Sequence, residues 1–278
     1  MAMVSDKVIL TLNATLLAAV FVTGCSSLVP VGHQANGAGG NTGIQTARPQ
    51  ALAPDDNALL PRQPYDPAGQ KIPYVAQPNP YTTAVTAVPP AARSEFVVAS
   101  YLFRAGNLKA AQTRFRELAE KYPSLSGPWV KLGAIAEKDG KYNEAVNDYK
   151  KATSVNRNNV NTYIALGLLQ RRQGQFYDAQ NTYIEALHVW KDFPEAHLNL
   201  GILYDLYMNK PEDAQKHFEA YCFLTGNKDK QAHKWLTEVK QRTGISGSFI
   251  DIPPKDIAVV PVGQDDDKGT PNNAGSSS

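Results

Sequence analysis

The chain has 278 residues, of which 42% are hydrophobic and 19% charged, and this is enough apolar material for one helical core of ordinary size. Its 28 basic and 26 acidic residues nearly cancel to a net charge of +2, so no basic surface for nucleic acid is expected. Many of the 19 prolines precede the part of the chain with helical periodicity, which predicts one modest domain with long flanks.

The N-terminal segment has the pattern of a bacterial signal peptide. Residues 8–22 read VILTLNATLLAAVFV, an apolar run that follows Lys7 and is too short for a membrane span of about 20 residues. The next residues, Val22-Thr23-Gly24-Cys25, resemble the bacterial lipobox, in which the cysteine thiol receives a diacylglycerol. We therefore expect residues 1–24 to be removed and Cys25 to be lipidated. An ordinary secretory signal or an uncleaved anchor is the alternative.

The lipobox resemblance also implies a location. Ser26, rather than an aspartate, follows the cysteine, and in the usual sorting rule this directs a lipoprotein to the outer membrane. Two or three acyl chains anchor firmly, since each buried CH₂ contributes about 0.8 kcal/mol. We expect a lipid-anchored protein that faces the periplasm.

Residues 25–91 are expected to form a tether between this anchor and the folded part. The segment is rich in Gly, Asn, Ala and Pro and poor in aliphatic clusters, so it cannot offset the entropy of ordering. Its Gly-rich start should be flexible and its Pro-rich remainder stiffer. Tyr65, Tyr74 and Tyr81 are either docking points within the tether or incidental.

A period of 34 residues is the strongest regularity in the sequence. At this spacing an apolar residue recurs, and a small residue follows it directly. The apolar residues are Val98, Leu132, Leu166 and Leu200, and the small residues are Ala99, Gly133, Gly167 and Gly201. A constant period of this length predicts a helical repeat in which each unit packs on the next.

The same period places special residues at fixed points of each repeat. Gly106, Gly140 and Gly174 fall between two helical stretches, where a residue that tolerates positive φ ends the first helix at little cost. In the second stretch a small residue allows close helix approach, and an aromatic residue lies four positions later on the same face. The small residues are Ala111, Ala145, Ala179 and Ala214, and the aromatic ones are Phe115, Tyr149, Tyr183 and Phe218.

The segments WVKLGAIAEKDGKYNEAVNDYKKA and YIALGLLQRRQGQFYDAQNTYIEA resemble the tetratricopeptide repeat (TPR) at almost every marked position. The resemblance covers about residues 92–227 and implies an all-α solenoid of about four helix hairpins. Repeat 1 departs from the pattern with Glu95 where Trp129 and Tyr163 stand in the next two repeats. Repeat 4 has His197 there and an insertion at its turn, so that Ala214 comes one residue late.

Two segments follow the repeats. Residues 229–243, stopped by Gly244, predict a helix that caps the array with Trp235, Leu236 and Val239, so that the TPR domain spans residues 92–244. Residues 245–278 form a tail. Its first part, SFIDIPPKDIAVVPV, is apolar enough to dock as an extended segment on this chain or on a partner, whereas the remainder should be disordered.

The sequence gives no sign of an enzyme. The five histidines, at positions 33, 188, 197, 217 and 233, share no metal-ligand spacing, and no nucleophile elbow or phosphate-binding loop is present. Cys25 and Cys222 lie in different kinds of segment and are not expected to pair. We therefore predict neither catalysis, metal nor cofactor, and no small-molecule substrate.

A binding groove is the expected functional feature. In the TPR register, the fifth and ninth residues of each repeat line the concave surface. These residues, nearly all apolar, are Phe96, Ser100, Val130, Ala134, Ile164, Leu168, Leu198 and Ile202. Arg171 adjoins them, and Arg104, Lys138 and Arg172 flank them. Such a groove suits an amphipathic helix or extended peptide with some acidic residues, although the chain's own linker or tail could fill it instead.

The size, anchor and repeats together resemble the TPR lipoproteins of pilus systems, the pilotin class that helps a secretin assemble in the outer membrane. That resemblance implies an assembly factor or scaffold for an envelope complex of pilus or secretion type. The alternative is a scaffold for murein-processing enzymes or for a TonB-type energy-transduction complex. TPRs that clamp a C-terminal carboxylate carry Lys and Asn in the groove, so that subclass is disfavoured.

Overall fold

The computed structural model describes residues 56–83 and 88–254, all within the second of the chain's two units, residues 47–278. The expectations for the signal peptide, for Cys25 and for the tail beyond Pro254 lie outside the described residues. Within them the regular elements are helices, of which α1 (Asp56–Leu59) and α2 (Pro80–Thr83) are single turns. The longer helices are α3 (Pro90–Arg104), α4 (Leu108–Lys121), α5 (Ser126–Lys138), α6 (Tyr142–Val155), α7 (Val160–Arg172), α8 (Phe176–Val189), α9 (Pro194–Leu206), α10 (Pro211–Leu224) and α11 (Lys230–Thr243).

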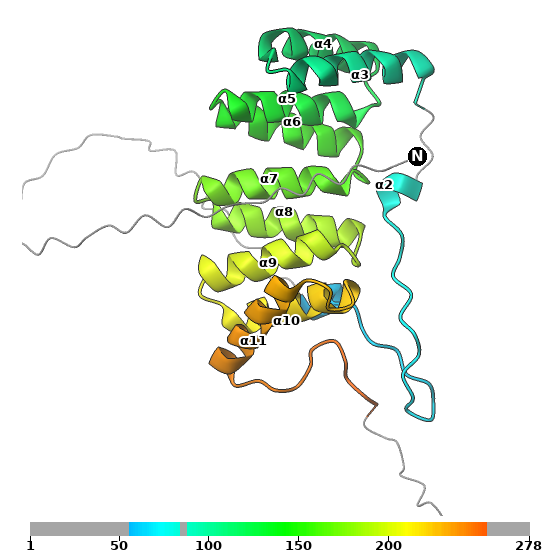
Figure 1. The fold of residues 1–278 in the computed structure, drawn as a ribbon, viewed down its shortest axis with the longest axis vertical. Coiled ribbons are helices and arrows are strands. Elements are labelled where there is room, and N and C mark those ends of the chain that lie inside the picture. Colours follow the sequence, from blue (N-terminus) through cyan, green and yellow to red (C-terminus); the bar gives the residue numbers. More distant parts are fainter. Residues whose placement is uncertain (1–55, 84–87, 255–278) are drawn as a thin grey trace, which may run out of the picture. The chain divides into compact units, whose positions relative to one another are not determined.

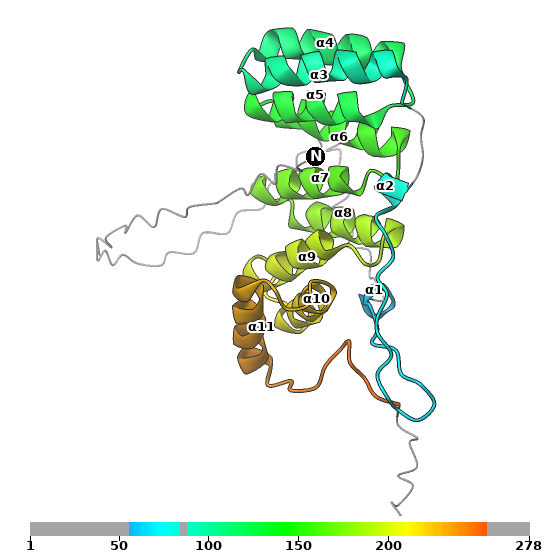
Figure 2. The same ribbon diagram turned by 45° about the vertical axis from the view of Figure 1, so that its right-hand side comes forward.

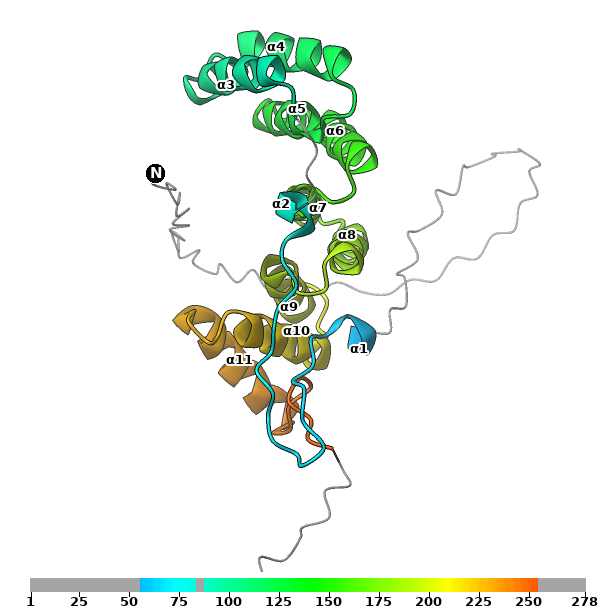
Figure 3. The same cartoon turned by 90° about the vertical axis from the view of Figure 1, so that its right-hand side faces the viewer.

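The long helices form an array in which each helix packs against the next one in the chain (Figure 1). The pairs α3–α4, α5–α6, α7–α8 and α9–α10 are hairpins, and α11 packs on α10. Seen from the side, α3, α5 and α7 lie on one side of the array and α4, α6 and α8 on the other (Figure 3). The predicted all-α array of four helix hairpins closed by a further helix is confirmed.

The turn of each hairpin contains a residue with positive φ, and the first three of these residues are the glycines that the sequence predicts there. Gly106, Gly140 and Gly174 have φ values of 79°, 73° and 74°, in the left-handed region that favours glycine. In the fourth hairpin Asn209 takes this role with a φ of 51°, and Pro211 then begins α10. Asparagine is among the residues that tolerate this region best, so the departure from glycine preserves the turn.

The glycine inside the first helix of hairpins two to four is required by an aromatic ring of the second helix. A Cβ atom added to Gly167 would lie 2.3 Å from Cε1 of Tyr183, and one added to Gly133 would lie 2.8 Å from the ring of Tyr149. Both rings are buried. The paired small and aromatic positions of the 34-residue period are therefore the points where the two helices of a hairpin touch.

The last helix closes the array as predicted. Asp229 caps the start of α11 by accepting hydrogen bonds from the backbone N–H groups of Gln231 and Ala232, and Gly244 ends it with a φ of 70°. Leu236 and Val239 are buried in the core that they share with α7 to α10. The apolar end of repeat 4 is thereby removed from water.

Residues 56–83, which we call the strap, belong to the segment expected to be a tether, yet they pack along one edge of the array (Figure 2). Leu59 joins the main core, and Leu60 packs against Ala220 of α10. The hydroxyl of Tyr74 donates to Asp192 at 2.6 Å, and the ring of Tyr74 lies edge-on to Phe223. A few well-placed apolar and hydrogen-bonding residues thus fix a segment whose average composition is that of a linker.

The first part of the tail packs beside the strap. The hydroxyl of Ser248 and the N–H of Phe249 donate to the buried carboxylate of Glu219, which also pairs with Lys240 at 2.9 Å. Ile250 is buried against Leu60, and its carbonyl accepts from the N–H of Gln63 at 3.1 Å. Residues 248–250 therefore dock on the chain itself, at the end of the array formed by α10 and α11.

Candidate protein-binding face

The residues predicted for the groove come from the first helix of every hairpin. α3, α5, α7 and α9 each supply two of them, and α7 supplies Arg171 as well. All nine are partly buried: Phe96, Ser100, Val130, Ala134, Ile164, Leu168, Arg171, Leu198 and Ile202. We call the surface that they occupy the first-helix face. Their role in binding stays a prediction.

The groove residues are partly buried because they contribute both to the core and to the surface. Ile164, Leu198 and Ile202 pack against the main core and still keep exposed surface. Phe96 lies edge-on to Phe115 at 5.4 Å between ring centroids. The face is therefore apolar but rigidly supported from below, which lowers the entropic cost of binding a partner.

Two lysines lie close to the Phe103 ring of α3. The ammonium groups of Lys131 and Lys138 each lie 5.5 Å from the centroid of the Phe103 ring. Arg171 lies 5.6 Å from the ring of Tyr207, and its Nη1 is buried without a hydrogen-bond partner among the described residues. These cation–aromatic contacts leave the positive charges free to meet carboxylates.

Other charges near the face are already paired. Arg172 forms an ion pair with Glu137, and Arg242 pairs with Asp205 at 2.5 Å. By contrast, the described contacts of Lys131 and Lys138 are with the Phe103 ring. The sequence singled out Lys138 and Arg171 but missed Lys131, Phe103 and Tyr207. A signal for them was present in the sequence, since basic and aromatic residues also occur at other positions of the first helices.

The described contacts of residues 56–80 of the strap lie mainly at a loop edge and on α10. Its hydrogen bonds to Asp192 and Trp190 lie at the loop between α8 and α9, and its apolar contacts lie on α10. In Figure 2 it runs along the helix ends rather than across the helices. Residues 56–80 thus lie along the loop edge, whereas Tyr81 lines a cavity together with Phe96, and occupation of the groove by the chain's own linker or tail stays an untested alternative.

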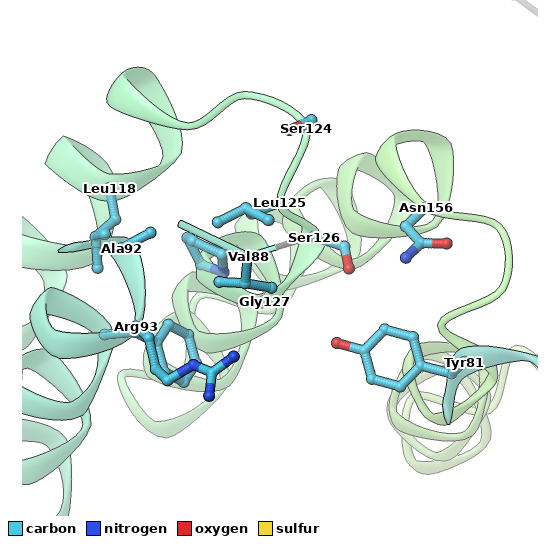
Figure 4. A pocket seen from close by; sticks show the side chains of 12 residues that line it. Tyr81, Val88, Ala92, Arg93, Leu118, Ser124, Leu125, Ser126, Gly127 and Asn156 are labelled. Atoms are coloured by element: carbon cyan, nitrogen blue, oxygen red, sulfur yellow. The ribbon is translucent and has the colours of Figure 1, made fainter. Parts of the chain in front are cut away.

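A cavity of about 300 Å³ lies where the strap reaches α3 (Figure 4). Phe96, Leu118 and Leu125 supply apolar wall, and Arg93 stands at its edge. The ring of Tyr81 extends from the strap toward Ser126 and Asn156. The volume is small for a metabolite site but suits one or two apolar side chains of a bound polypeptide, with the guanidinium placed for a carboxylate.

The one close pair of histidines in the described residues lies in the core. His197 Nε2 donates to the carbonyl of Lys191 at 2.9 Å, so its Nδ1 accepts from Nδ1–H of His217, also at 2.9 Å. His217 Nε2 is left without a hydrogen-bond partner in the described residues. Burial lowers the pKa of His197 to about 4 and lowers that of His217 well below its usual value. Both rings are therefore neutral and part of the packing.

The described residues hold no group of three or more His, Cys, Asp or Glu side chains that could bind a metal ion. Within the same ranges, none of the helices combines the length and hydrophobicity that a membrane span requires. Cys222 is buried, and burial raises the pKa of its thiol to about 11. An unreactive thiol of this kind behaves as a small apolar side chain.

Comparison with known protein families fits this geometry. A TPR family model matches residues 137–174, and a second tetratricopeptide-repeat model matches residues 164–205. The chain contains tetratricopeptide repeats. The matched residues run from the end of α5 to α9 and include the residues of the first-helix face that lie on α7 and α9. A search of curated proteins finds no match.

Solved structures resemble the TPR array at low sequence identity. A structure of MamA from Desulfovibrio magneticus has a TM-score of 0.47 and 18% identity, covering 57% of this chain and 88% of that one. PilF from Pseudomonas aeruginosa gives 0.48 and 20%, covering 55% and 69%. A tetratricopeptide repeat protein from Parabacteroides merdae gives 0.45 and 16%, covering 57% and 61%.

Proposed function

We propose that this TPR protein binds a protein partner through the first-helix face and serves as an assembly factor or scaffold for a complex of the bacterial envelope. The observation that carries the proposal is the row of half-buried apolar side chains on α3, α5, α7 and α9, bordered by Lys131 and Lys138, which have no carboxylate partner among the described residues. Such a surface suits a helix or extended segment with apolar anchors and some acidic residues.

The two ends of the face would contribute differently. Apolar anchors on Leu168 and Ile202 would supply affinity, since a fully buried aliphatic side chain contributes about 1.5–3 kcal/mol. Lys131 and Lys138 would determine the orientation of the partner and increase the rate of association with acidic segments. The cavity beside Phe96 would take an apolar side chain at the partner's end nearest α3.

The envelope location rests on the lipobox-like Val22-Thr23-Gly24-Cys25 and on Ser26, which favour an outer-membrane anchor and a periplasmic TPR domain. Within the envelope, we favour a pilus or secretion complex, by the resemblance to pilotin-class TPR lipoproteins. A scaffold for murein-processing enzymes or for a TonB-type complex is the second candidate. The two differ in what the protein should capture, namely a secretin in one case and hydrolases or energising subunits in the other.

The binding face is tested by placing carboxylates on it. We expect Leu168→Asp with Ile202→Asp to abolish capture of partner proteins from envelope extracts, because two apolar anchors are lost and the partner's acidic residues are repelled. Tyr142→Asp with Tyr177→Asp is the matched control, since these exposed tyrosines lie at the starts of α6 and α8, on the second helices. Mass spectrometry of the captured proteins, with circular dichroism to verify helicity, provides the measurement.

A second variant removes any ambiguity about folding. Lys131→Glu with Lys138→Glu changes side chains whose described contacts are with the Phe103 ring, so helicity should persist while capture weakens at least tenfold at low salt. Capture that survives both variants, or that is lost equally in the tyrosine control, would rule out the first-helix face as the binding surface.

A further inference from the structure

The first repeat exposes a position that the other repeats bury. Leu132, Leu166 and Leu200 are only 3%, 4% and 0% exposed, because the second helix of the preceding repeat packs on each of their helices. Val98 occupies the same position of the 34-residue period on α3 and is 56% exposed. No described helix lies in front of α3 to cover it. Among the described residues, the array therefore begins with an uncovered apolar packing surface.

Val98 is not alone on this surface. Val97 and Tyr101 on the same side of α3 are 57% and 66% exposed. We call these three residues the α3 patch. A hollow of about 370 Å³ adjoins Val98 between α3 and α4, with Leu118 at its base. An apolar patch next to a hollow is the form of a surface that accepts side chains from another molecule.

The other end of the array is finished differently. The residues of α11 that face water are polar: Lys230, Gln231, His233, Lys234, Thr237, Glu238, Gln241 and Arg242. A repeat array needs such polar ends to stay soluble, since an uncovered apolar end binds whatever matches it. The α11 end meets this requirement and the α3 end does not, which indicates that the α3 end is covered in the working protein.

Both ends of the described chain lie at the end of the array opposite to the α3 patch. The described chain begins at α1, where Leu60 packs on α10, and ends at Pro254, just after Ile250 in the same cluster. Figure 2 shows α1 and α10 near one end of the array and α3 and α4 at the other. Residues 84–87 directly precede this end of the array in the chain, and four residues cannot replace a packed helix.

The charges around the patch are balanced in a way that suits a second copy of the same surface. Glu95 pairs with Lys121 at 2.7 Å, and Arg114 pairs with Glu117 at 3.1 Å. All four line the hollow beside Val98. Two acids and two bases can exchange partners when the surface is rotated onto its copy, whereas a strongly acidic or basic partner would leave two like charges facing it.

We propose that two copies of this protein associate through a twofold contact in which the α3 patches face each other across Val98. The contact replaces the helix that would precede α3 in a longer array. It leaves Leu168 on α7 and Ile202 on α9 clear. Each copy therefore keeps the part of the first-helix face on α7 and α9, and the dimer contact is separate from the anchors Leu168 and Ile202.

Sedimentation of the mature chain, residues 25–278 with Cys25→Ala to prevent lipidation, tests the contact. We expect a species of twice the chain mass, and we expect Val98→Asp to raise the dimer dissociation constant at least tenfold, because it places two carboxylates at the axis. Leu206→Asp is the matched control, since Leu206 is 70% exposed at the end of α9 and should leave the dimer intact. Val98 is exposed, so circular dichroism should show unchanged helicity.

A crosslink tests the geometry directly. In the same Cys25→Ala chain, Val98→Cys should form a disulfide-linked dimer under mild oxidation and Leu206→Cys should not, because the remaining cysteine, Cys222, is buried. A chain that stays monomeric at every concentration would overturn the proposal, whether the introduced Val98→Cys thiol is protected by another segment or open to labelling. A dimer that persists unchanged in Val98→Asp would overturn it equally.

Discussion

His197 and His217 make the core sensitive to acid, because both rings are completely buried and neither has a carboxylate as its hydrogen-bond partner. The groups that bear on them are also few. The hydrogen bond to the Lys191 carbonyl and the carboxylate of Asp192 raise the pKa of His197, and the ammonium group of Lys191 lowers it, while His197 and Lys216 lower that of His217. Burial has a larger effect on both pKa values than these groups, so the two histidines bind protons less readily in the folded protein than in the unfolded chain.

The sign of the effect follows from this difference. Below the unfolded pKa of about 6.5, each unfolded histidine binds a proton and each folded one does not, so the free energy of unfolding falls as pH falls toward 4. The loss is as much as about 1.4 kcal/mol per pH unit for each histidine. We expect the thermal unfolding midpoint to drop between about pH 7 and pH 5, measured by circular dichroism.

The assignment to this pair is checked by replacement. His197→Phe with His217→Leu should flatten the pH dependence, and His233→Gln, at an exposed histidine of α11, should leave it as it is. An unaltered slope in the double variant would show that other groups cause the acid sensitivity.

At this scale the sequence predicted the positions set by local sterics and missed the one set by tertiary contact. Gly140 and Gly174 were recognisable because positive φ excludes most other residues. Gly167 and Tyr183 were recognisable because their spacing repeats. The histidine pair was not, since His197 and His217 lie on different helices and their pairing depends on how α10 packs on α9 after the insertion in their turn.

The strap is the element for which average composition misled. Residues 56–83 have the Pro-rich, aliphatic-poor character of a linker, and a composition argument assigns them no fixed structure. They pack because a few of their residues make specific contacts with the array. Leu60 packs against Ala220, and the hydroxyl of Tyr74 donates to Asp192. The sequence offered Tyr65, Tyr74 and Tyr81 as docking points, and the hydroxyl of Tyr65 does contact Asp251 within the chain.

Asp192 should hold the middle of the strap. Its buried carboxylate accepts from the Tyr74 hydroxyl at 2.6 Å and from the N–H of Gln77 at 2.8 Å. Asp192→Ala leaves these donors without an acceptor, at a cost of about 2–5 kcal/mol, so the strap should detach locally while the array stays folded. Hydrogen exchange of residues 72–80 should accelerate at least tenfold. Asp139→Ala, at an exposed carboxylate after α5, is the control.

A strap that detaches should also free the indole of Trp190, whose Nε1 donates to the carbonyl of Gln77 at 2.8 Å. A red shift of tryptophan emission is therefore expected together with the faster exchange. Unchanged exchange in Asp192→Ala would mean that the apolar contacts of Leu59 and Leu60 alone fix the strap.

For the whole molecule, the sequence periodicity was sufficient to predict the helical array but not the strap or the exposed α3 end. The 34-residue spacing predicted the number of hairpins, because each repeat can bury its apolar side only on the next one. It also placed the nine candidate residues on the first helices. It could not show that the strap runs along the helix ends or that the α3 end is open, since both depend on segments that lack the repeat.

The anchor is the last property of the whole molecule that can be tested. If Cys25 carries the lipid, Cys25→Ala should abolish metabolic labelling with palmitate and move the protein from the membrane fraction to the soluble periplasmic fraction. The reason is that two or three acyl chains supply the membrane affinity at about 0.8 kcal/mol for each buried CH₂. Cys222→Ala is the matched control and should label normally, because the Cys222 thiol is buried and its pKa is raised to about 11. A Cys25→Ala protein that loses the label yet stays with the membrane would instead identify residues 8–22 as an uncleaved anchor, and persistent labelling would exclude Cys25 as the lipidation site.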